Sequence, residues 1–264
     1  MIRACIFDLG GTVVDRYSLT PFLALRKTFR DKDIYVSNDL IFKDMGKNKK
    51  DHIRNILYSP NISQKWIHHY QTLQEEDVSS LMNDFNNVQM EYSEKIIDIL
   101  PETKDCVHTL QSRDIQIGCT TGFNAENMNI IRKKLNQNDI YFNSYVSSTC
   151  IDKPSRPHPY MIQKNMELLN IRDPKTVIKL DDTVVGIHEG IAANCLTVGV
   201  AKWSIYMNIS TIDDAYYFHH DLHKEEMDEK LIQSRKILNE AGADFVIDSL
   251  DELPSLIDKI NNNK

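Results

Sequence analysis

The sequence has no long hydrophobic run and no excess of basic residues. The apolar stretch at residues 2–7 stops at Asp8, too soon for a signal-peptide core, and no run approaches the roughly 18 residues of a membrane span. There are 31 Lys and Arg against 38 Asp and Glu, a net charge of −7. Nucleic-acid binders normally carry a basic excess. We therefore expect neither a membrane nor a nucleic acid as a partner.

Cysteine is sparse and unpatterned. The five cysteines are an odd number, lie far apart and form no CxxC pair, which argues against a disulfide framework and a zinc site. We expect a reduced, cytoplasmic protein. Its 264 residues, 41% of them hydrophobic, suffice for one large domain or two smaller ones with a core that needs no covalent staples.

Glycine is also scarce, and its nine residues are concentrated. Pairs of glycines occur at positions 10 and 11, 118 and 122, and 186 and 190, each just after an apolar segment. Glycine is placed where a backbone bends or approaches a ligand closely. In open α/β sheets, ligands bind at the edge where the strands end, so these pairs indicate a site at that edge.

Short apolar segments alternate with helical patterns through most of the chain. Expected strands cover residues 2–7, 115–119, 144–148, 176–180, 196–200 and 244–247, and expected helices cover residues 102–112, 124–135, 158–169, 184–193 and 224–240. This alternation predicts an α/β fold with a mainly parallel sheet covered on both faces.

Residues 19–100 differ, because they show helical patterns and no convincing strand. Thr20 followed by Pro21 predicts a helix start, and further helices are expected at residues 37–44, 49–58, 62–73 and 79–99. We therefore divide the chain into a core (residues 1–18), an inserted all-helical cap domain (residues 19–100) over the carboxyl edge of the sheet, and the remainder of the core (residues 101–264).

Four polar segments follow the expected strands or open helices. They are Asp8–Asp15 (DLGGTVVD), Thr120–Gly122 (TTG), Ser155–Pro159 (SRPHP) and Leu180–Thr183 (LDDT). The first presents a carboxylate beside a glycine turn. The second and third offer hydroxyls, amides and an arginine to an anion such as phosphate, and the fourth offers paired carboxylates to a divalent cation. Taken singly, each is as readily a helix cap or a surface arginine.

In their joint order the four segments resemble those of the haloacid dehalogenase superfamily. The resemblance implies a Rossmann-like core with a helical cap inserted after the first segment, and Asp8 as the nucleophile. It also implies that Gly10, Thr120, Thr121, Gly122 and Arg156 bind the phosphoryl group. Magnesium would be held by Asp8, the Gly10 carbonyl and Asp182.

The residue at position 10 limits which branches of the superfamily the chain can resemble. Most phosphatases of this superfamily carry a second aspartate two residues after the nucleophile, where it protonates the leaving oxygen. This chain has Gly10 there. Two branches of the superfamily dispense with that acid, the dehalogenases and the phosphonatases, and dehalogenation needs no metal and so leaves Asp181 and Asp182 unexplained.

The cap segment Met45–Arg54 (MGKNKKDHIR) resembles the phosphonatase signature Met-Gly-x-x-Lys-x-Asp-His. In that family the lysine, here Lys49, forms a Schiff base, and Met45 and His52 match the flanking positions. A departing carbon needs an electron sink, which an iminium supplies. The lysine needs a lowered pKa, for which Lys47, Lys50 and His52 are candidate cations.

The chain departs from the phosphonatase pattern at two further places. The aromatic after the Thr-Thr-Gly segment is Phe123 instead of tyrosine, and the second acid of the last segment falls at Gly186. Asp181, which stands where that family usually has glycine, is a candidate replacement for this acid. The resemblance implies hydrolysis of phosphonoacetaldehyde with Mg²⁺, by an enzyme that dimerises through its cap. Two alternatives stay open: another magnesium-dependent hydrolase of a phosphate monoester or related phosphonate, and a non-catalytic binder of phosphoryl ligands.

Overall fold

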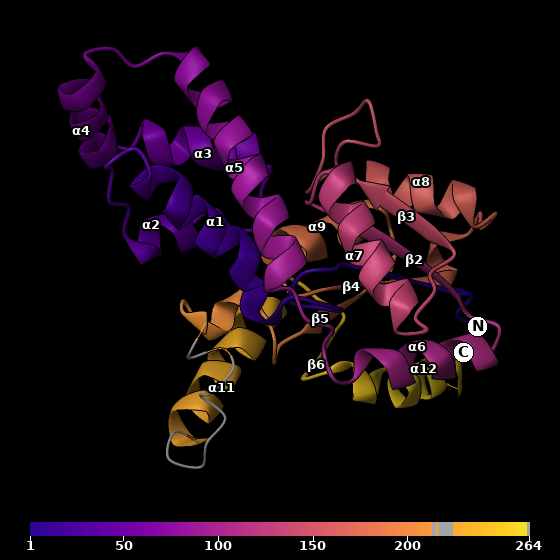
Figure 1. Cartoon of the computed structure of the whole chain (residues 1–264). Helices are drawn as coiled ribbons and strands as arrows, with labels where there is room; N and C mark the ends of the chain where they lie inside the picture. The colour runs from indigo at the N-terminus through magenta and orange to yellow at the C-terminus, as the bar shows by residue number, and fades with distance from the viewer. Residues whose placement is uncertain (213–214, 216–223, 263–264) are drawn as a thin grey trace.

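The computed structural model describes residues 1–212, 215 and 224–262 (Figure 1). Its strands are β1 (Ala4–Phe7), β2 (Gln116–Thr121), β3 (Ser144–Ser147), β4 (Val177–Asp181), β5 (Leu196–Val200) and β6 (Phe245–Ile247). Its α-helices are α1 (Leu19–Arg30), α2 (Asn38–Phe42), α3 (Lys49–Leu57), α4 (Pro60–Tyr70), α5 (Glu75–Lys95), α6 (Thr103–Ser112), α7 (Ala125–Gln137), α8 (Tyr160–Leu168), α9 (Val184–Ala192), α11 (Lys224–Glu240) and α12 (Leu253–Asn262). Short 3₁₀ turns include η1 (Arg16–Ser18), η2 (Pro174–Thr176), η3 (Ile205–Met207) and η5 (Leu250–Glu252).

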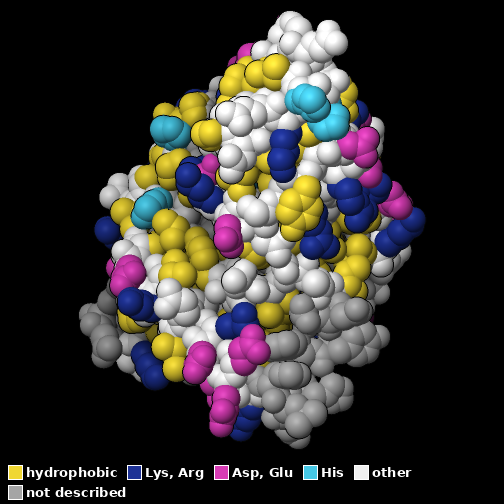
Figure 2. Space-filling model, turned by 90° about the vertical axis from the view of Figure 1, so that its left-hand side faces the viewer, with side chains coloured by type: hydrophobic (Ala, Val, Ile, Leu, Met, Phe, Trp, Pro, Cys, Tyr) yellow, Lys and Arg dark blue, Asp and Glu magenta, His cyan; other side chains and the backbone are white. Residues whose placement is uncertain are grey.

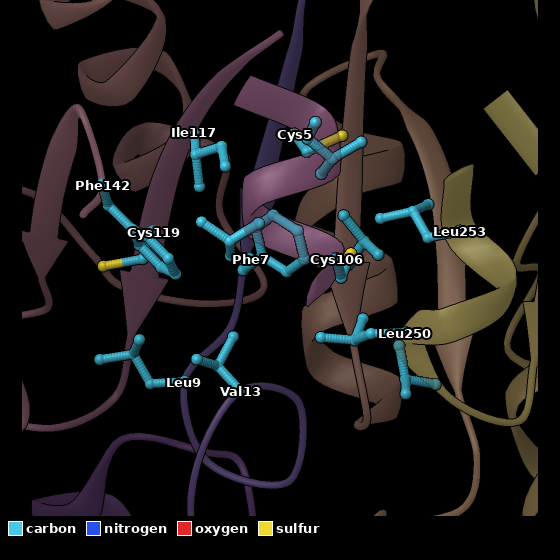
Figure 3. Close-up of a cluster of buried hydrophobic side chains, with 14 of the residues drawn as sticks. Cys5, Phe7, Leu9, Val13, Cys106, Ile117, Cys119, Phe142, Leu250 and Leu253 are labelled. Atoms are coloured by element: carbon cyan, nitrogen blue, oxygen red, sulfur yellow. The ribbon is translucent and has the colours of Figure 1, made fainter. Parts of the chain in front are cut away.

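The six strands form one sheet in the order β3-β2-β1-β4-β5-β6, and every neighbouring pair is parallel. Alternate residues of β1 are buried on opposite faces, as strand geometry requires. Cys5 and Phe7 join a cluster with α6, α7 and α12, and Ala4 and Ile6 join a second cluster with α8. Figure 3 shows Phe7 amid side chains from β2 and α6. The expected α/β fold with a parallel, doubly covered sheet is therefore confirmed.

Residues 19–100, all of them described, contain the five helices α1–α5 and no strand. These helices stand to one side of the sheet in Figure 1 and have an apolar cluster of their own, which includes Phe22, Ile53 and Phe85. Trp203 and Ile205, which follow β5, are buried in the same cluster. The helical block thus packs around side chains from the connection that follows β5.

Two chain segments that lie side by side connect the helical block to the sheet. Val14 on the outgoing segment forms a β-bridge with Ile99 on the returning one. The Asp15 amide donates to the Asp98 carbonyl at 3.0 Å, and the Arg16 Nε donates to the Asp98 carboxylate at 2.8 Å. Paired in this way, the two segments fix where the block meets the edge of the sheet.

Several helix limits differ from those expected. The first helix begins at Leu19, and the Thr20 hydroxyl donates to Asp15 Oδ1 at 2.7 Å instead of capping the helix. Pro60 opens α4 at its first turn, where a missing N–H does no harm. The fifth helix spans Glu75–Lys95 instead of residues 79–99. The last helix, α12, was not anticipated.

The surface that Figure 2 shows carries basic and acidic side chains interspersed with hydrophobic ones, so that face presents no field of a single sign. All five cysteines are unpaired, and four of them are buried. Among the described residues, no helix is long and apolar enough to cross a membrane.

Candidate active site

Three parallel strands bring predicted site residues to one edge of the sheet. Phe7 pairs in register with the residue just before Thr120 on β2 and with the residue just before Asp181 on β4. Asp8, Thr120 and Asp181 come next on their chains, so they meet where the strands end, as expected for a ligand site in this kind of sheet. The sequence predicted this convergence from the strand ends alone.

Arg156 reaches the same point from the loop before α8. Its Nη2 lies 2.6 Å from Asp8 Oδ1 and donates to the Thr120 hydroxyl at 2.8 Å and to the Thr120 carbonyl at 3.0 Å. Its Nε donates to Glu189 Oε2 at 2.9 Å. A buried guanidinium held by this many partners is fixed in position, which suits an arginine that orients an oxyanion.

Asp8, Asp181 and Asp182 form a buried cluster in which one oxygen of each lies within 4.8 Å of the others. Burial raises the pKa of Asp8 to about 6, although the charge of Arg156 opposes the shift. Burial also raises the pKa of Asp182 well above its usual value, and the charges of Asp8 and Asp181 add to that effect. Three carboxylates this close repel one another unless a cation lies among them.

The donor set of this cluster fits a magnesium ion. Asp182 Oδ1 is buried and has no hydrogen-bond partner among the described residues, while its Oδ2 accepts the Ile205 N–H at 3.2 Å. Carboxylate oxygens are the ligands that magnesium prefers. The surrounding network also has four buried carboxylates and two buried cations. When all four carboxylates are ionised, it lacks the two positive charges that one Mg²⁺ carries. The members of this network are Asp8, Asp181, Asp182, Glu189, Lys179 and Arg156.

Asp181 occupies the space that a side chain at position 186 would need. A Cβ built on Gly186 would lie 1.8 Å from the Asp181 carboxyl carbon. Burial alone would raise the pKa of Asp181, but Arg156 and Lys179 outweigh it and hold the pKa below its usual value. Asp181 is therefore a charged carboxylate. It fills the space where the side chain of the family's second acid, at position 186, would start.

Lys49 reaches the site from the helical block. It is the first residue of α3, whose Asn48 cap accepts from the Lys50 amide at 2.9 Å. Burial lowers the pKa of Lys49 to about 8; Asp8 opposes the shift and Arg156 reinforces it. The loop before Lys49 is held close to α9, since a Cβ on Gly46 would lie 2.7 Å from a Val185 methyl.

The cation beside Lys49 is not one of those expected. His52 is fully buried, and burial followed by the charge of Lys49 lowers its pKa to about 3, so it is neutral at physiological pH. Lys47 is paired with Asp44 at 2.5 Å, and Lys50 is exposed. The charge that reinforces the shift of Lys49 comes from Arg156, which sequence spacing could not place next to it.

A cavity of about 500 Å³, its open mouth included, lies between the helical block and the edge of the sheet. Thr120, His52, Asp181 and Asp182 are buried outside its lining. The predicted residues that line it are Asp8, Gly10, Met45, Lys49, Thr121, Gly122 and Arg156, and Ser18, Gln89, Phe123 and Ile205 are among its other lining residues.

Lys179 and Glu189 were not among the predicted site residues. The Lys179 Nζ donates to the Thr120 hydroxyl at 2.7 Å and lies 2.9 Å from Asp181 Oδ2, and Glu189 Oε2 accepts from Arg156. Both side chains are fully buried. A lysine inside an otherwise apolar strand was the available signal for the first, because charged residues are almost never fully buried unless paired.

Comparison with known proteins agrees with this geometry. A family model described as haloacid dehalogenase-like hydrolase matches residues 2–194. A phosphonoacetaldehyde hydrolase from Bacteroides fragilis is 31% identical over 262 residues, covering 99% of this chain and 97% of the relative. Another, from Lysinibacillus sphaericus, is 32% identical over 261 residues, covering 98% and 95% of the two chains.

A solved structure is also similar. The crystal structure of a phosphonoacetaldehyde hydrolase-like protein from Oleispira antarctica matches with a TM-score of 0.88 and 27% identity, covering 99% of this chain and 93% of that one. The chain is therefore a hydrolase of the haloacid dehalogenase superfamily. Within that superfamily it belongs to the phosphonatase branch.

Proposed function

We propose that this chain hydrolyses the carbon–phosphorus bond of phosphonoacetaldehyde, giving acetaldehyde and phosphate. One observation carries the proposal: Lys49, an amine of lowered pKa, lines the same cavity as Asp8 and Arg156, while position 10 holds no acid. That combination serves a carbon leaving group and does not serve an oxygen leaving group. The curated relatives described above carry the name of this activity.

The reaction begins with binding and imine formation. Arg156 and Thr121 hold the phosphonyl oxygens at the edge of the sheet. The neutral Lys49 amine adds to the aldehyde carbon, and the carbonyl oxygen takes up the proton that the amine loses. With a second proton, taken from solvent, that oxygen departs as water and leaves an iminium. Met45 lines the cavity, and His52 is buried and neutral. We propose that both side chains help to keep the Lys49 amine neutral and therefore nucleophilic.

Cleavage follows at phosphorus. An Asp8 oxygen forms a bond to phosphorus as the carbon–phosphorus bond breaks, and the released electron pair neutralises the iminium to give an enamine on Lys49. No leaving oxygen has to be protonated, which agrees with Gly10. Water then hydrolyses the aspartyl phosphate, and protonation and hydrolysis of the enamine release acetaldehyde and free Lys49.

Magnesium is the proposed cofactor. Asp8, the Gly10 carbonyl and Asp182 would hold it, with Asp181 as the further carboxylate, and it would supply the charge that offsets repulsion between Asp8 and the anionic substrate. Asp8→Asn preserves the shape of the side chain, so we expect a folded protein whose turnover falls at least about a thousandfold.

The test is borohydride trapping during turnover of phosphonoacetaldehyde with Mg²⁺. Reduction of the imine to a secondary amine should inactivate the enzyme, and peptide mapping should place the added mass on Lys49. Lys49→Arg keeps the charge but forms no imine, so it should be inactive and untrapped. Lys50→Arg is the matched control, because Lys50 is exposed and lies outside the cavity. Trapping at another lysine, or turnover by Lys49→Arg, would contradict the proposal.

A substrate panel distinguishes the alternatives. Phosphonoacetaldehyde should be turned over in preference to phosphonopyruvate, acetyl phosphate and p-nitrophenyl phosphate, and only with Mg²⁺. A preference for p-nitrophenyl phosphate would indicate a phosphate monoesterase, and no turnover at all would indicate a non-catalytic binder. Gly10→Asp should shift the preference toward phosphate esters, because it adds an acid that can protonate a leaving oxygen. The new side chain has room, since a Cβ there has ordinary contacts, 3.4 Å from Ser18 Oγ and 3.6 Å from Phe123.

A further inference from the structure

Gln89 is a polar residue on a buried apolar stripe. It lies on α5 in line with Val78, Leu81 and Phe85, spaced three or four residues apart, and all three are buried in the cluster of the helical block. Gln89 itself is only 3% exposed. Hydrophobic periodicity alone would place an apolar residue at this position.

The amide donor of Gln89 is unsatisfied. Its Nε2 is buried and has no hydrogen-bond partner in the part of the chain that the structure describes. A buried donor without a partner destabilises a folded protein, and a methionine of similar length would avoid the loss. The stability of the free protein therefore does not account for a glutamine here, and a bound ligand would.

Gln89 lines the cavity that Lys49, Asp8 and Arg156 also line. The core side of this cavity already supplies charge and hydroxyls for an anionic group. Gln89 comes from the helical block, as Lys49 does, and offers a neutral donor. A half-turn of its terminal amide exchanges Nε2 and Oε1, so that the donor can be presented to a ligand. A neutral donor in the same cavity as an attacking amine suits a carbonyl oxygen that gains negative charge.

We propose that Gln89 is a specificity residue that donates a hydrogen bond from Nε2 to the carbonyl oxygen of a 2-oxoalkyl phosphonate. The proposal rests on the proposed function. When the Lys49 nitrogen bonds to the carbonyl carbon, the π electron pair moves to oxygen, which takes the proton from nitrogen and later, with a second proton from solvent, leaves as water. Gln89 holds that oxygen through the addition and neither gains nor loses a proton.

Binding to proteins that cannot form the imine tests this directly. In a Lys49→Ala background with Mg²⁺, 2-oxopropylphosphonate should bind about tenfold more tightly than propylphosphonate, which lacks the carbonyl, as one hydrogen bond allows. Adding Gln89→Met should remove that advantage and leave propylphosphonate unchanged. Adding Asn87→Leu, on the exposed face of the same helix, should change neither affinity.

Thermal unfolding supplies a second readout. Gln89→Met alone should raise the unfolding temperature of the free protein, because the unpaired amide is gone, and should reduce phosphonoacetaldehyde turnover. Gln89→Glu, of equal size but without the NH₂ donor, covers the case in which the methionine variant does not fold; it too should lose the advantage of the ketone.

Two outcomes would overturn the assignment of Gln89: an equal loss of affinity for both phosphonates, or a preserved preference for the ketone. A wild-type protein that fails to cleave phosphonoacetaldehyde would instead overturn the proposed function, and the binding comparison, which needs no turnover, separates the two.

Discussion

Asp181 and Gly186 share one space, and this explains an exchange that looks arbitrary in the sequence. The phosphonatase pattern has glycine at position 181 and an acid at position 186, and this chain has an acid at 181 and glycine at 186. Since a Cβ at position 186 would lie 1.8 Å from the Asp181 carboxyl carbon, the two side chains exclude each other. A change at one position therefore requires a change at the other.

The exchange should be reversible only as a pair. Gly186→Asp alone forces a side chain into filled space and should destabilise the protein by about 1–3 kcal/mol or more. Asp181→Gly alone removes a carboxylate and should weaken magnesium binding. The double variant should recover both properties, measured by urea unfolding and by calorimetric titration with Mg²⁺. A double variant no better than Gly186→Asp alone would show that the positions are not coupled.

Lys49 should govern how the rate depends on pH. Its pKa is lowered to about 8, so the amine is mostly protonated below that pH and mostly neutral above it. Because the neutral amine attacks, kcat/KM should rise with pH to a plateau, with its midpoint near pH 8 instead of near 10.5. Asp44 is negatively charged and acts to raise this pKa. Asp44→Asn should therefore move the rising limb of the pH–rate profile to lower pH. A limb that stays in place in Asp44→Asn would assign it to another group.

Sequence patterns predicted which residues the fold brings together better than they predicted the electrostatics of those residues. Asp8, Thr120 and Asp182 end or follow apolar strands, which places them without any knowledge of side chains. The neutrality of His52 and the link from Arg156 to Lys49 depend on burial and on contacts between segments far apart in the chain. Gln89 gave no motif at all, because its environment is set by packing.

At the scale of elements, strands were located more accurately than helix ends. The mostly apolar residues 96–100, interrupted by Asp98, extend the helical pattern of α5, but the helix stops at Lys95. Ile97 and Leu100 are buried because they belong to the returning connection, where Ile99 bridges to Val14. Periodicity does not tell a helix face from a buried connection. The pattern of α12 was short, although Pro254 in its first turn was a start signal.

Lys134 of α7 holds the end of α5 in place. Its Nζ donates to the carbonyls of Ser93, Glu94 and Ile97 at 2.8–2.9 Å, capping groups that the helix leaves unpaired. Lys134→Met should destabilise the protein by about 1–3 kcal/mol in urea unfolding. Lys133→Met, at the exposed neighbouring position, is the control and should have little effect. Equal losses in both variants would refute the capping role.

At the scale of the whole molecule, the two apolar clusters are joined by the segment after β5. Trp203 and Ile205 are buried in the helical block, and the Ile205 amide also bonds Asp182. The same few residues therefore link packing of the block to the acidic cluster. The division of the chain into a core (residues 1–18 and 101–264) and a cap domain (residues 19–100) stays a prediction. So does the homodimer, which light scattering would detect as twice the 30.6 kDa of one chain.

Magnesium should act on the stability of the entire fold. Without it, burial and the charges of Asp8 and Asp181 disfavour the ionised form of Asp182, so the ionised cluster destabilises the folded state at neutral pH. Binding to the folded protein alone raises its stability by mass action, about 2.7 kcal/mol at a hundred times Kd. The unfolding temperature should therefore rise with Mg²⁺ and fall back with a chelator.

Asp182→Asn should stabilise the metal-free protein and remove the stabilisation by Mg²⁺. It keeps the size of the side chain and an oxygen for the Ile205 amide but removes a repelled charge. The metal-free variant should therefore unfold at a higher temperature than the metal-free wild type, and Mg²⁺ should no longer raise that temperature. Asp152→Asn, which changes an exposed aspartate outside the cluster, should leave both values unchanged. If Mg²⁺ raised the unfolding temperature of Asp182→Asn as much as that of the wild type, Asp182 would not be a metal ligand. Replacing a ligand that is essential for binding must reduce the stability that binding provides.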